Sequence, residues 1–171
     1  MKSTFLKSVF VMVLVIASVV AKAEGDIVGV ASGSKDHTTL VAAVKAADLV
    51  ATLQSKGPFT VFAPSNSAFD KLPAGTVDNL LKPENKALLA SILTYHVVAG
   101  NLDATAVLAA IKAGNGKAVL TTVNGGKLVA SLSGNDVILT DEKGGTAKVT
   151  ATNLKASNGV IHVIDKVVMP K

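Results

Sequence analysis

The stretch NGVIHVIDKVVMP, residues 158–170, combines a turn signal, a β-branched apolar run, one histidine and one acid. Asn158-Gly159 is typical of a tight turn, and Val160–Met169 is predicted to form a strand. Side chains alternate between the two faces of a strand, so His162 and Asp165 are expected to point to opposite faces. Unless a bulge intervenes, the two cannot act as adjacent metal ligands or as a base and its orienting acid.

The chain before this stretch divides into a mainly helical half and a β-rich half. Up to residue 93, apolar residues recur at helical spacing, and Pro and Gly residues separate the segments. After residue 114, β-branched runs alternate with Asn-Gly and Gly-Gly signals that are typical of hairpin turns. This order predicts an α+β fold. The predicted helices are 39–55, 76–81, 83–93 and 104–113, and the predicted strands are 59–63, 95–98, 118–123, 127–132, 137–140, 147–152 and 160–169.

The N-terminus has the three parts of a secretory signal peptide. Two lysines precede the apolar run Val9–Val20, and Ala21-Lys22-Ala23 offers small residues for cleavage. A membrane-spanning helix needs roughly 20 apolar residues, and Lys22 interrupts the run too early. We expect residues 1–23 to be removed, which leaves Glu24 at the N-terminus and no membrane span. No cysteine follows the run, so a lipid anchor is not supported. The predicted location is secreted or periplasmic.

Composition excludes several classes of function. All 17 basic residues are lysines; three of them precede residue 24, and the other 14 face 12 acids. The mature chain therefore carries a charge of about +2 and no arginine, the usual reader of phosphates and guanine edges, so nucleic-acid binding is not expected. The chain has no cysteine, which excludes disulfides, thiolate chemistry and zinc–cysteine sites. Residues 24–171 are enough for one domain held together by packing.

Three segments, taken in order, resemble the conserved motifs of fasciclin, or FAS1, domains. They are TVFAPSNSAF at residues 60–69, YHVV at residues 95–98, and NGVIHVIDKVVMP. The resemblance covers residues 36–170 as one domain, after a short N-terminal extension at residues 24–35, and is closest to secreted bacterial single-domain members. It implies a β wedge or sandwich of roughly seven strands with a layer of short helices. The motif residues with an implied structural role are Thr60, Pro64, Asn66, Phe69, Gly159, His162, Asp165 and Pro170.

The resemblance also implies a role in cell adhesion or in extracellular and envelope interactions, without a cofactor. In animal relatives, the Tyr-His segment and an Asp-Ile pair before the last motif are linked to integrin binding. Tyr95 and His96 match the first feature, but Asn153-Leu154 stands where the Asp-Ile pair is expected. Losing that acid removes the group best suited to a metal-dependent contact, so integrin binding is not predicted. Ser65 and Ala99 also depart from the family, which often has Thr and Pro there.

The predicted partner-binding segment consists of Tyr95, His96, Val97 and Val98. An exposed tyrosine beside two valines would form an apolar surface for a partner. A structural alternative stays open, in which Tyr95 and His96 hydrogen-bond nearby backbone at a helix-to-strand junction, and we favour it for His96. The expected partner is a cell-surface or extracellular-matrix protein or glycan, bound by a monomer.

Two other functions compete with the interaction module. An extracellular hydrolase of polysaccharide- or lignin-linked esters or amides would use Ser65 or Ser67 as nucleophile and His96 as base. Ser65 lies in APSN rather than in a GxSxG turn, and a serine between a strand and an apolar turn is typical of a helix cap. A small-ligand carrier would use a cleft beside the β wedge.

The sequence does not predict a metal site. A local metal site needs closely spaced ligands, and that spacing is absent from His37, His96 and His162. We therefore predict a non-enzymatic module with no metal and no cofactor.

Overall fold

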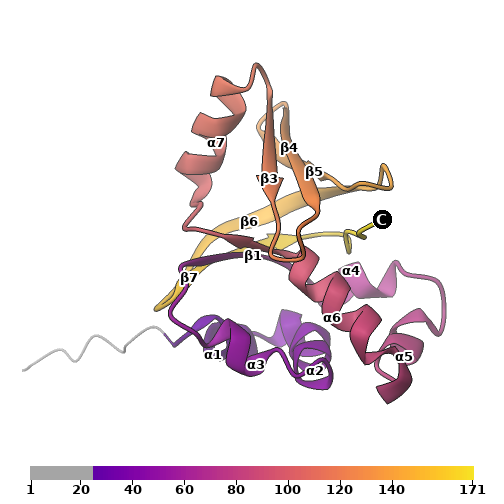
Figure 1. Cartoon of the computed structure of the whole chain (residues 1–171). Coiled ribbons are helices and arrows are strands. Elements are labelled where there is room, and N and C mark those ends of the chain that lie inside the picture. The colour runs from indigo at the N-terminus through magenta and orange to yellow at the C-terminus, as the bar shows by residue number, and fades with distance from the viewer. Residues whose placement is uncertain (1–24) are drawn as a thin grey trace, which may run out of the picture.

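The computed structural model describes residues 25–171, and the predicted signal peptide lies outside the described residues. In this part of the chain, seven strands form one sheet in the order β2-β1-β7-β6-β5-β4-β3. β1 and β7 are parallel, and the other neighbouring strands are antiparallel. A bridge between Val98 and Thr122 links the two end strands, so the sheet closes almost into a barrel (Figure 1). The strands are β1 (Phe59–Pro64), β2 (Val97–Ala99), β3 (Lys117–Thr121), β4 (Lys127–Ser133), β5 (Asp136–Thr140), β6 (Thr146–Ala156) and β7 (Gly159–Ile164).

Most of the helices precede β2 in the chain and form a layer on one side of the sheet, whereas α7 packs against β3 (Figure 1). The predicted helices at 76–81 and 104–113 are confirmed to within one residue. The region predicted at 39–55 divides into two shorter helices, and the one predicted at 83–93 begins as a 3₁₀ turn and continues as a helix to Tyr95. The helices are α1 (Ile27–Ser32), α2 (Thr38–Ala46), α3 (Val50–Leu53), α4 (Asn66–Asp70), α5 (Thr76–Leu80), α6 (Lys86–Tyr95) and α7 (Ala104–Ala113), with 3₁₀ turns at Lys35–His37 and Pro83–Asn85. The fold class is α+β, as predicted.

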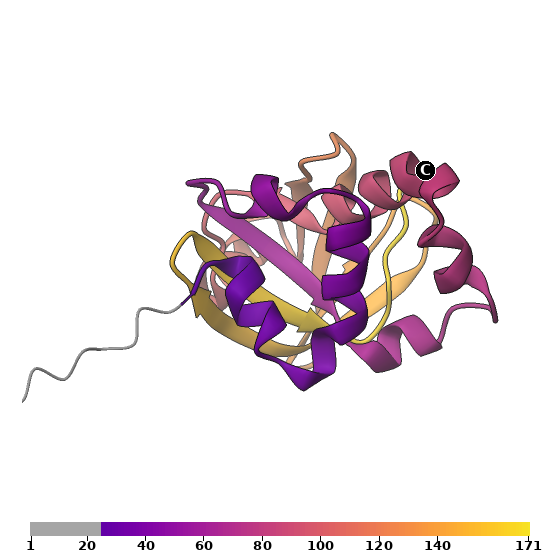
Figure 2. The same ribbon diagram turned by 90° about the horizontal axis from the view of Figure 1, so that it is seen from below.

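β1 and β7 are buried on both faces because a separate core lies on each side. Val61 and Ile161 face a cluster built with the helical layer, which crosses these strands in Figure 2. Phe62 and Ile164 face a second cluster inside the barrel. A strand that is buried on both faces needs apolar residues at successive positions, which explains the continuous apolar runs TVFAP and GVIHVI.

β3, β4 and β5 have one buried and one exposed face. Leu128, Ala130 and Leu139 are completely buried in the barrel, where Ile111 of α7 packs with them. The intervening residues point outward, as expected for an antiparallel sheet with one solvated face. Tight turns at residues 122–126 and 133–136 join these strands, so the predicted hairpins are confirmed.

Three features of the fold differ from the sequence prediction. The strand predicted at 95–98 begins only at Val97, because Tyr95 is the last residue of α6. The residues of α1 were assigned to an N-terminal extension, but Ile27 is 2% exposed and belongs to the core of the helical layer. The strand predicted at 160–169 ends at Ile164, so its second half was wrong. The Asp165 N–H donates to the Lys148 carbonyl (3.1 Å), and beyond it the chain leaves the sheet.

Candidate functional site

The predicted partner-binding segment is part of the core, which corrects the expectation of an exposed surface. Tyr95, His96, Val97 and Val98 are 0%, 2%, 5% and 3% exposed. α6 ends at Tyr95 and β2 begins at Val97, so the chain turns sharply between the two cores. Val97 packs in the helical cluster, whereas Tyr95 and Val98 pack inside the barrel. None of the four side chains can reach a partner without opening the fold.

Tyr95 ties α6 to two hairpins. Its hydroxyl donates to the Lys127 carbonyl (2.6 Å) and accepts from the Glu142 N–H (3.2 Å). Burial raises the pKa of the phenol, so the hydroxyl stays protonated and able to donate. Gly126 permits this approach, because a Cβ there would lie 2.7 Å from Cε2 of the ring. Tyr95 is therefore a structural residue.

His96 holds the C-terminal segment in place. Its Nδ1 lies 2.8 Å from the Ile92 carbonyl and must donate, so Nε2 is the nitrogen that accepts from the Val168 N–H (3.2 Å). Burial lowers the pKa of His96 to about 4, and the negative charge of Asp141 only partly offsets this effect. The ring is neutral near pH 7. It has no free nitrogen with which to act as a base.

Asp141 is a buried acid that the sequence analysis did not single out. Its Oδ1 accepts from the N–H groups of Lys143 (3.0 Å) and Gly145 (2.7 Å), which shapes the β5–β6 turn. Its Oδ2 accepts from the Met169 N–H (3.0 Å) and so fixes the C-terminal segment beside His96. An Asp three positions before a Gly-Gly pair is a turn signal, and that pattern predicts the first of these roles.

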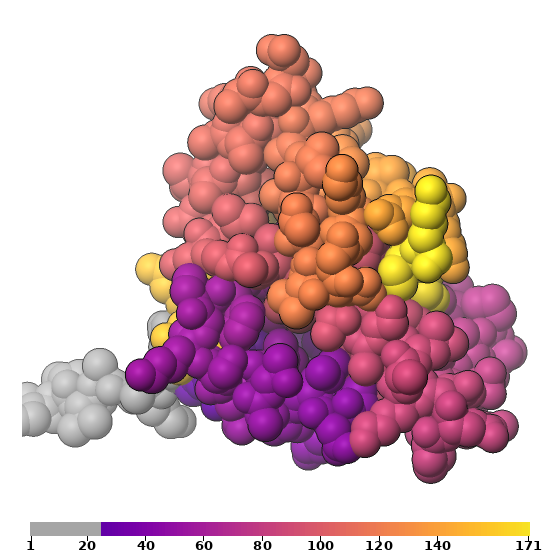
Figure 3. All heavy atoms as spheres, viewed as in Figure 1, coloured from indigo at the N-terminus to yellow at the C-terminus, as the bar shows by residue number. Residues whose placement is uncertain are grey.

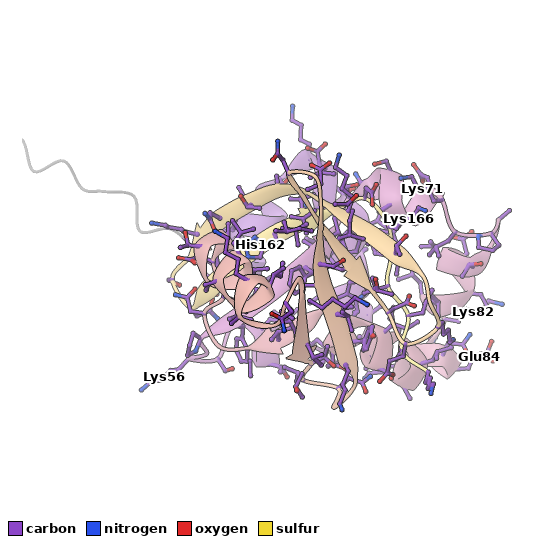
Figure 4. The ribbon with its side chains drawn as sticks, turned by 90° about the horizontal axis from the view of Figure 1, so that it is seen from above. Lys56, Lys71, Lys82, Glu84, His162 and Lys166 are labelled. Atoms are coloured by element: carbon purple, nitrogen blue, oxygen red, sulfur yellow. The ribbon has the colours of Figure 1, made fainter. Side chains whose placement is uncertain are left out.

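His162 and Asp165 bond to different groups. His162 lies inside the molecule, where it stacks on Phe62 with ring centroids 5.6 Å apart, while the labelled lysines extend from the surface (Figure 4). Its Nε2 donates to the Leu102 carbonyl (2.7 Å), its Nδ1 accepts from the Asn153 N–H (3.4 Å), and burial lowers its pKa. Asp165 instead accepts from the Lys148 N–H (2.8 Å) at the rim.

The remaining motif residues also serve the fold. The Ser65 hydroxyl accepts from the Ala68 N–H (3.3 Å) and caps α4, as predicted, and its side-chain neighbour is Ser67 rather than His96. Thr60 donates to the Gly100 carbonyl from inside the sheet. Pro64 and Phe69 are buried. The Asn66 side chain accepts a hydrogen bond from the Thr39 N–H. Gly159 is needed because a Cβ there would collide with the Phe59 carbonyl.

Chemically active groups do not converge in the described part of the chain. His37 pairs through Nδ1 with the Ser34 hydroxyl (2.8 Å), far in sequence from the other two histidines, and burial lowers its pKa. Among residues 25–171, no three His, Asp or Glu side chains are grouped in a way that could hold a metal ion. No helix in this range has the length and apolar character needed to cross a membrane.

An open sheet face is the main surface feature that the sequence analysis missed. We call it the outer sheet face. The outward residues of β3, β4 and β5 stand in register, with Val119 beside Val129 and Ile138 on the next row. Val119 is 61% exposed, the largest value among the exposed large apolar side chains of the described residues. The outer sheet face consists of Lys117, Val119, Thr121, Lys127, Val129, Ser131, Ile138, Thr140 and Lys148.

The sequence model of the fasciclin domain matches residues 35–170. The chain belongs to the fasciclin domain family. Protein sll1483 of Synechocystis is 48% identical over 159 residues, which are 90% of this chain and 81% of that protein. The immunogenic protein MPB70 of Mycobacterium bovis is 38% identical, over 90% of this chain and 74% of its own length. The transforming growth factor-beta-induced protein ig-h3 of Sus scrofa is 36% identical over 85% of this chain but only 19% of its own length.

A solved structure agrees with the family assignment. A pair of FAS1 domains from the insect cell adhesion molecule Fasciclin I superposes with a TM-score of 0.58 and 24% sequence identity, covering 74% of this chain and 42% of that one. This likeness establishes the FAS1 fold. The resemblance inferred from the three motifs is thus confirmed.

The Asn153-Leu154 position has a structural explanation in this chain. Asn153 has a φ of 59°, in the left-handed region that asparagine tolerates better than most residues. Its Oδ1 accepts from the Ala104 N–H (2.9 Å) at the start of α7. Leu154 is 38% exposed. Asn153 therefore serves a bulge within β6 and the start of α7.

Proposed function

We propose that this fasciclin-domain protein works outside the cytoplasm as an adhesion or interaction module rather than as an enzyme. One observation carries the proposal: the motif side chains that could do chemistry are committed to structural hydrogen bonds. Ser65 caps a helix, and both ring nitrogens of His96 and of His162 are bonded to backbone groups. A domain arranged in this way acts through its surface.

The relatives support the proposed location outside the cytoplasm. They include a cell surface glycolipoprotein of Mycobacterium bovis, 34% identical over 90% of this chain, and the insect cell adhesion molecule Fasciclin I shares the fold. The predicted signal peptide at residues 1–23 supports a secreted or periplasmic location. The proposed partner is a cell-surface or extracellular-matrix protein or glycan, bound by one copy of the chain.

The outer sheet face replaces Tyr95–Val98 as the proposed binding surface. Its centre is β-branched and apolar around Val119 and Val129, and its edge carries Lys117 and Lys127. Apolar centres with polar edges are typical of protein interaction surfaces. The lysines favour a partner surface that carries negative charge, and they make binding weaken as salt concentration rises.

A retention assay tests this proposal. The purified protein is immobilised, and retention of cells or envelope fragments from the producing organism is measured against a blank surface. Val119→Glu is expected to abolish retention, because it places a charge in the apolar centre. The matched control is Leu88→Glu, since Leu88 is 53% exposed on α6, away from the outer sheet face. Two results would reject the proposed surface. One is retention by the wild-type protein no higher than that of the blank surface, and the other is an equal loss of retention in Val119→Glu and Leu88→Glu.

The hydrolase alternative has its own measurement. Ester and amide substrates built on polysaccharide or lignin fragments are incubated with the protein, with Ser65→Ala, and with His96→Ala. The proposal predicts no turnover above the uncatalysed rate. Turnover that both substitutions abolish in folded protein would establish an enzyme instead.

A further inference from the structure

An apolar cavity lies between the helical layer and the sheet. Side chains from α1, α2, α3 and α6 form one wall, and β1, β2 and β7 form the other. Its volume is about 40 Å³, counted as the space open to the centre of a water-sized sphere. The inner wall is buried and includes Ile27, Val44, Leu53, Val61, Leu93 and Ile161. The cavity lies beneath the seam between α1–α3 and the β3–β4 turn, on the face seen in Figure 3.

Water is a poor occupant of this cavity. On the same measure one water needs roughly 10–15 Å³, so there is room for about three. A buried water needs two to four polar partners. The wall offers few, because both nitrogens of His96 are bonded elsewhere and the Thr94 hydroxyl donates to the Ala90 carbonyl (2.7 Å). Hydrocarbon would fill the space without leaving a polar group unsatisfied.

The cavity also has an entrance. Thr52 on α3 and Val123 beyond β3 line it and are exposed, and Val123 is 42% exposed. Val41 and Leu49 are half-buried beside them. Among the described residues, no Lys, Asp or Glu lines the cavity, so nothing there would neutralise a charged ligand. The occupant that fits is the uncharged end of a hydrocarbon chain, with the remainder of the molecule at the entrance.

We propose that this cavity is a binding site for the terminal alkyl segment of a small neutral amphipathic molecule, such as a fatty alcohol or ester. The site is separate from the outer sheet face, so either proposal can fail without the other. Burying each further methylene tightens binding about fourfold. Affinity rises with chain length until the cavity is full and then levels off.

The test is a chain-length series of primary alcohols from butanol to decanol, measured by calorimetry with the purified protein. The expected result is a fall in Kd of about fourfold per carbon over the first members, followed by a plateau. Methyl NOEs from the bound alcohol are expected at Val44 and Ile161. Kd values independent of chain length, or NOEs confined to other surfaces, would overturn the proposal. Binding to phosphatidylcholine vesicles with none to dispersed octanol would also overturn it.

Two variants locate the site. Ala31→Leu places a larger side chain in the cavity wall on α1 and is expected to weaken octanol binding at least tenfold. The matched control is Ala109→Leu, on the exposed face of α7, with unchanged binding. A second variant, Val44→Ala, enlarges the cavity and shifts the plateau to a longer alcohol. Equal octanol affinity in wild type and a folded Ala31→Leu protein, with an unshifted plateau in Val44→Ala, would place binding elsewhere.

Discussion

Lowering the pH from 7 to 4 perturbs the buried ring of His96. In the folded protein burial holds the pKa of His96 at about 4, whereas an exposed histidine in the unfolded chain has a pKa of about 6.5. Between these values the unfolded chain binds a proton that the folded protein excludes. Stability therefore falls as the pH falls, beginning near pH 6.5 and levelling off below about pH 4. Above pH 6.5 the ring is neutral in both states and has no effect on the pH dependence.

The size of this effect follows from the two pKa values. The gap of about 2.5 corresponds to at most about 3.4 kcal/mol, with about 2 kcal/mol lost by pH 5 and about 3 kcal/mol by pH 4. Burial also lowers the pKa values of His37 and His162, so both add losses of the same sign. A protonated His96 cannot accept from the Val168 N–H, so the C-terminal segment loses this hydrogen bond as well.

The assay is urea unfolding followed by circular dichroism at a series of pH values, together with an NMR titration of the histidine ring protons. His96→Gln is the control, because it removes the titrating group while its amide can still reach the Val168 N–H. Wild type is expected to lose about 2 kcal/mol more than His96→Gln between pH 7 and pH 5. Equal losses in both proteins, or an NMR midpoint for His96 near 6.5, would refute the reasoning.

Three further substitutions test the contacts around the motifs. Tyr95→Phe leaves the Lys127 carbonyl and the Glu142 N–H without their buried partner, and is expected to cost about 1–3 kcal/mol in urea unfolding. Gly126→Ala forces a Cβ against the Tyr95 ring and is expected to cost about 1–3 kcal/mol by overpacking. Asn158→Ala removes bonds to three backbone groups of the helical layer, with an expected loss of about 1–3 kcal/mol by thermal denaturation.

Two of these substitutions, Gly126→Ala and Asn158→Ala, have a matched control variant. Combining Gly126→Ala with Tyr95→Leu relieves the clash, so the double variant is expected to lose less than the sum of the singles. Strict additivity would contradict the proposed contact. For Tyr95→Phe, unchanged stability would show that the hydroxyl has no net role. Asn158→Asp retains the acceptor but loses the amide donor, and a cost equal to that of Asn158→Ala would assign the effect to the two donated bonds.

Local patterns predicted most elements of this fold. The helix at 104–113 has its Asp103 cap and its terminal glycine within the sequence itself, and the hairpins carry their own glycine turns. Such signals depend only on neighbouring residues. The sequence did not predict α1, because this helix is only six residues long, contains Gly29 and is held by the distant Asn158 side chain.

The candidate site was harder to predict because its contacts are distant in sequence. The YHVV segment has the composition of an apolar surface, and its burial depends on a turn between two cores. His96 bonds to Val168, which is 72 residues away. The spacing of apolar residues along the chain carries no information about a contact between residues so far apart in sequence. The outer sheet face was missed for a related reason, since alternation in β3 and β4 does not say which face a helix will cover.

The central claim is that the three fasciclin motifs hold the fold while the outer sheet face binds the partner. Retention of cells or envelope fragments by Val119→Glu and Tyr95→Phe, compared at a temperature where both are folded, tests it most directly. The account predicts that Val119→Glu loses retention and that Tyr95→Phe keeps it despite lower stability. Loss of retention in folded Tyr95→Phe, with full retention in Val119→Glu, would contradict the account.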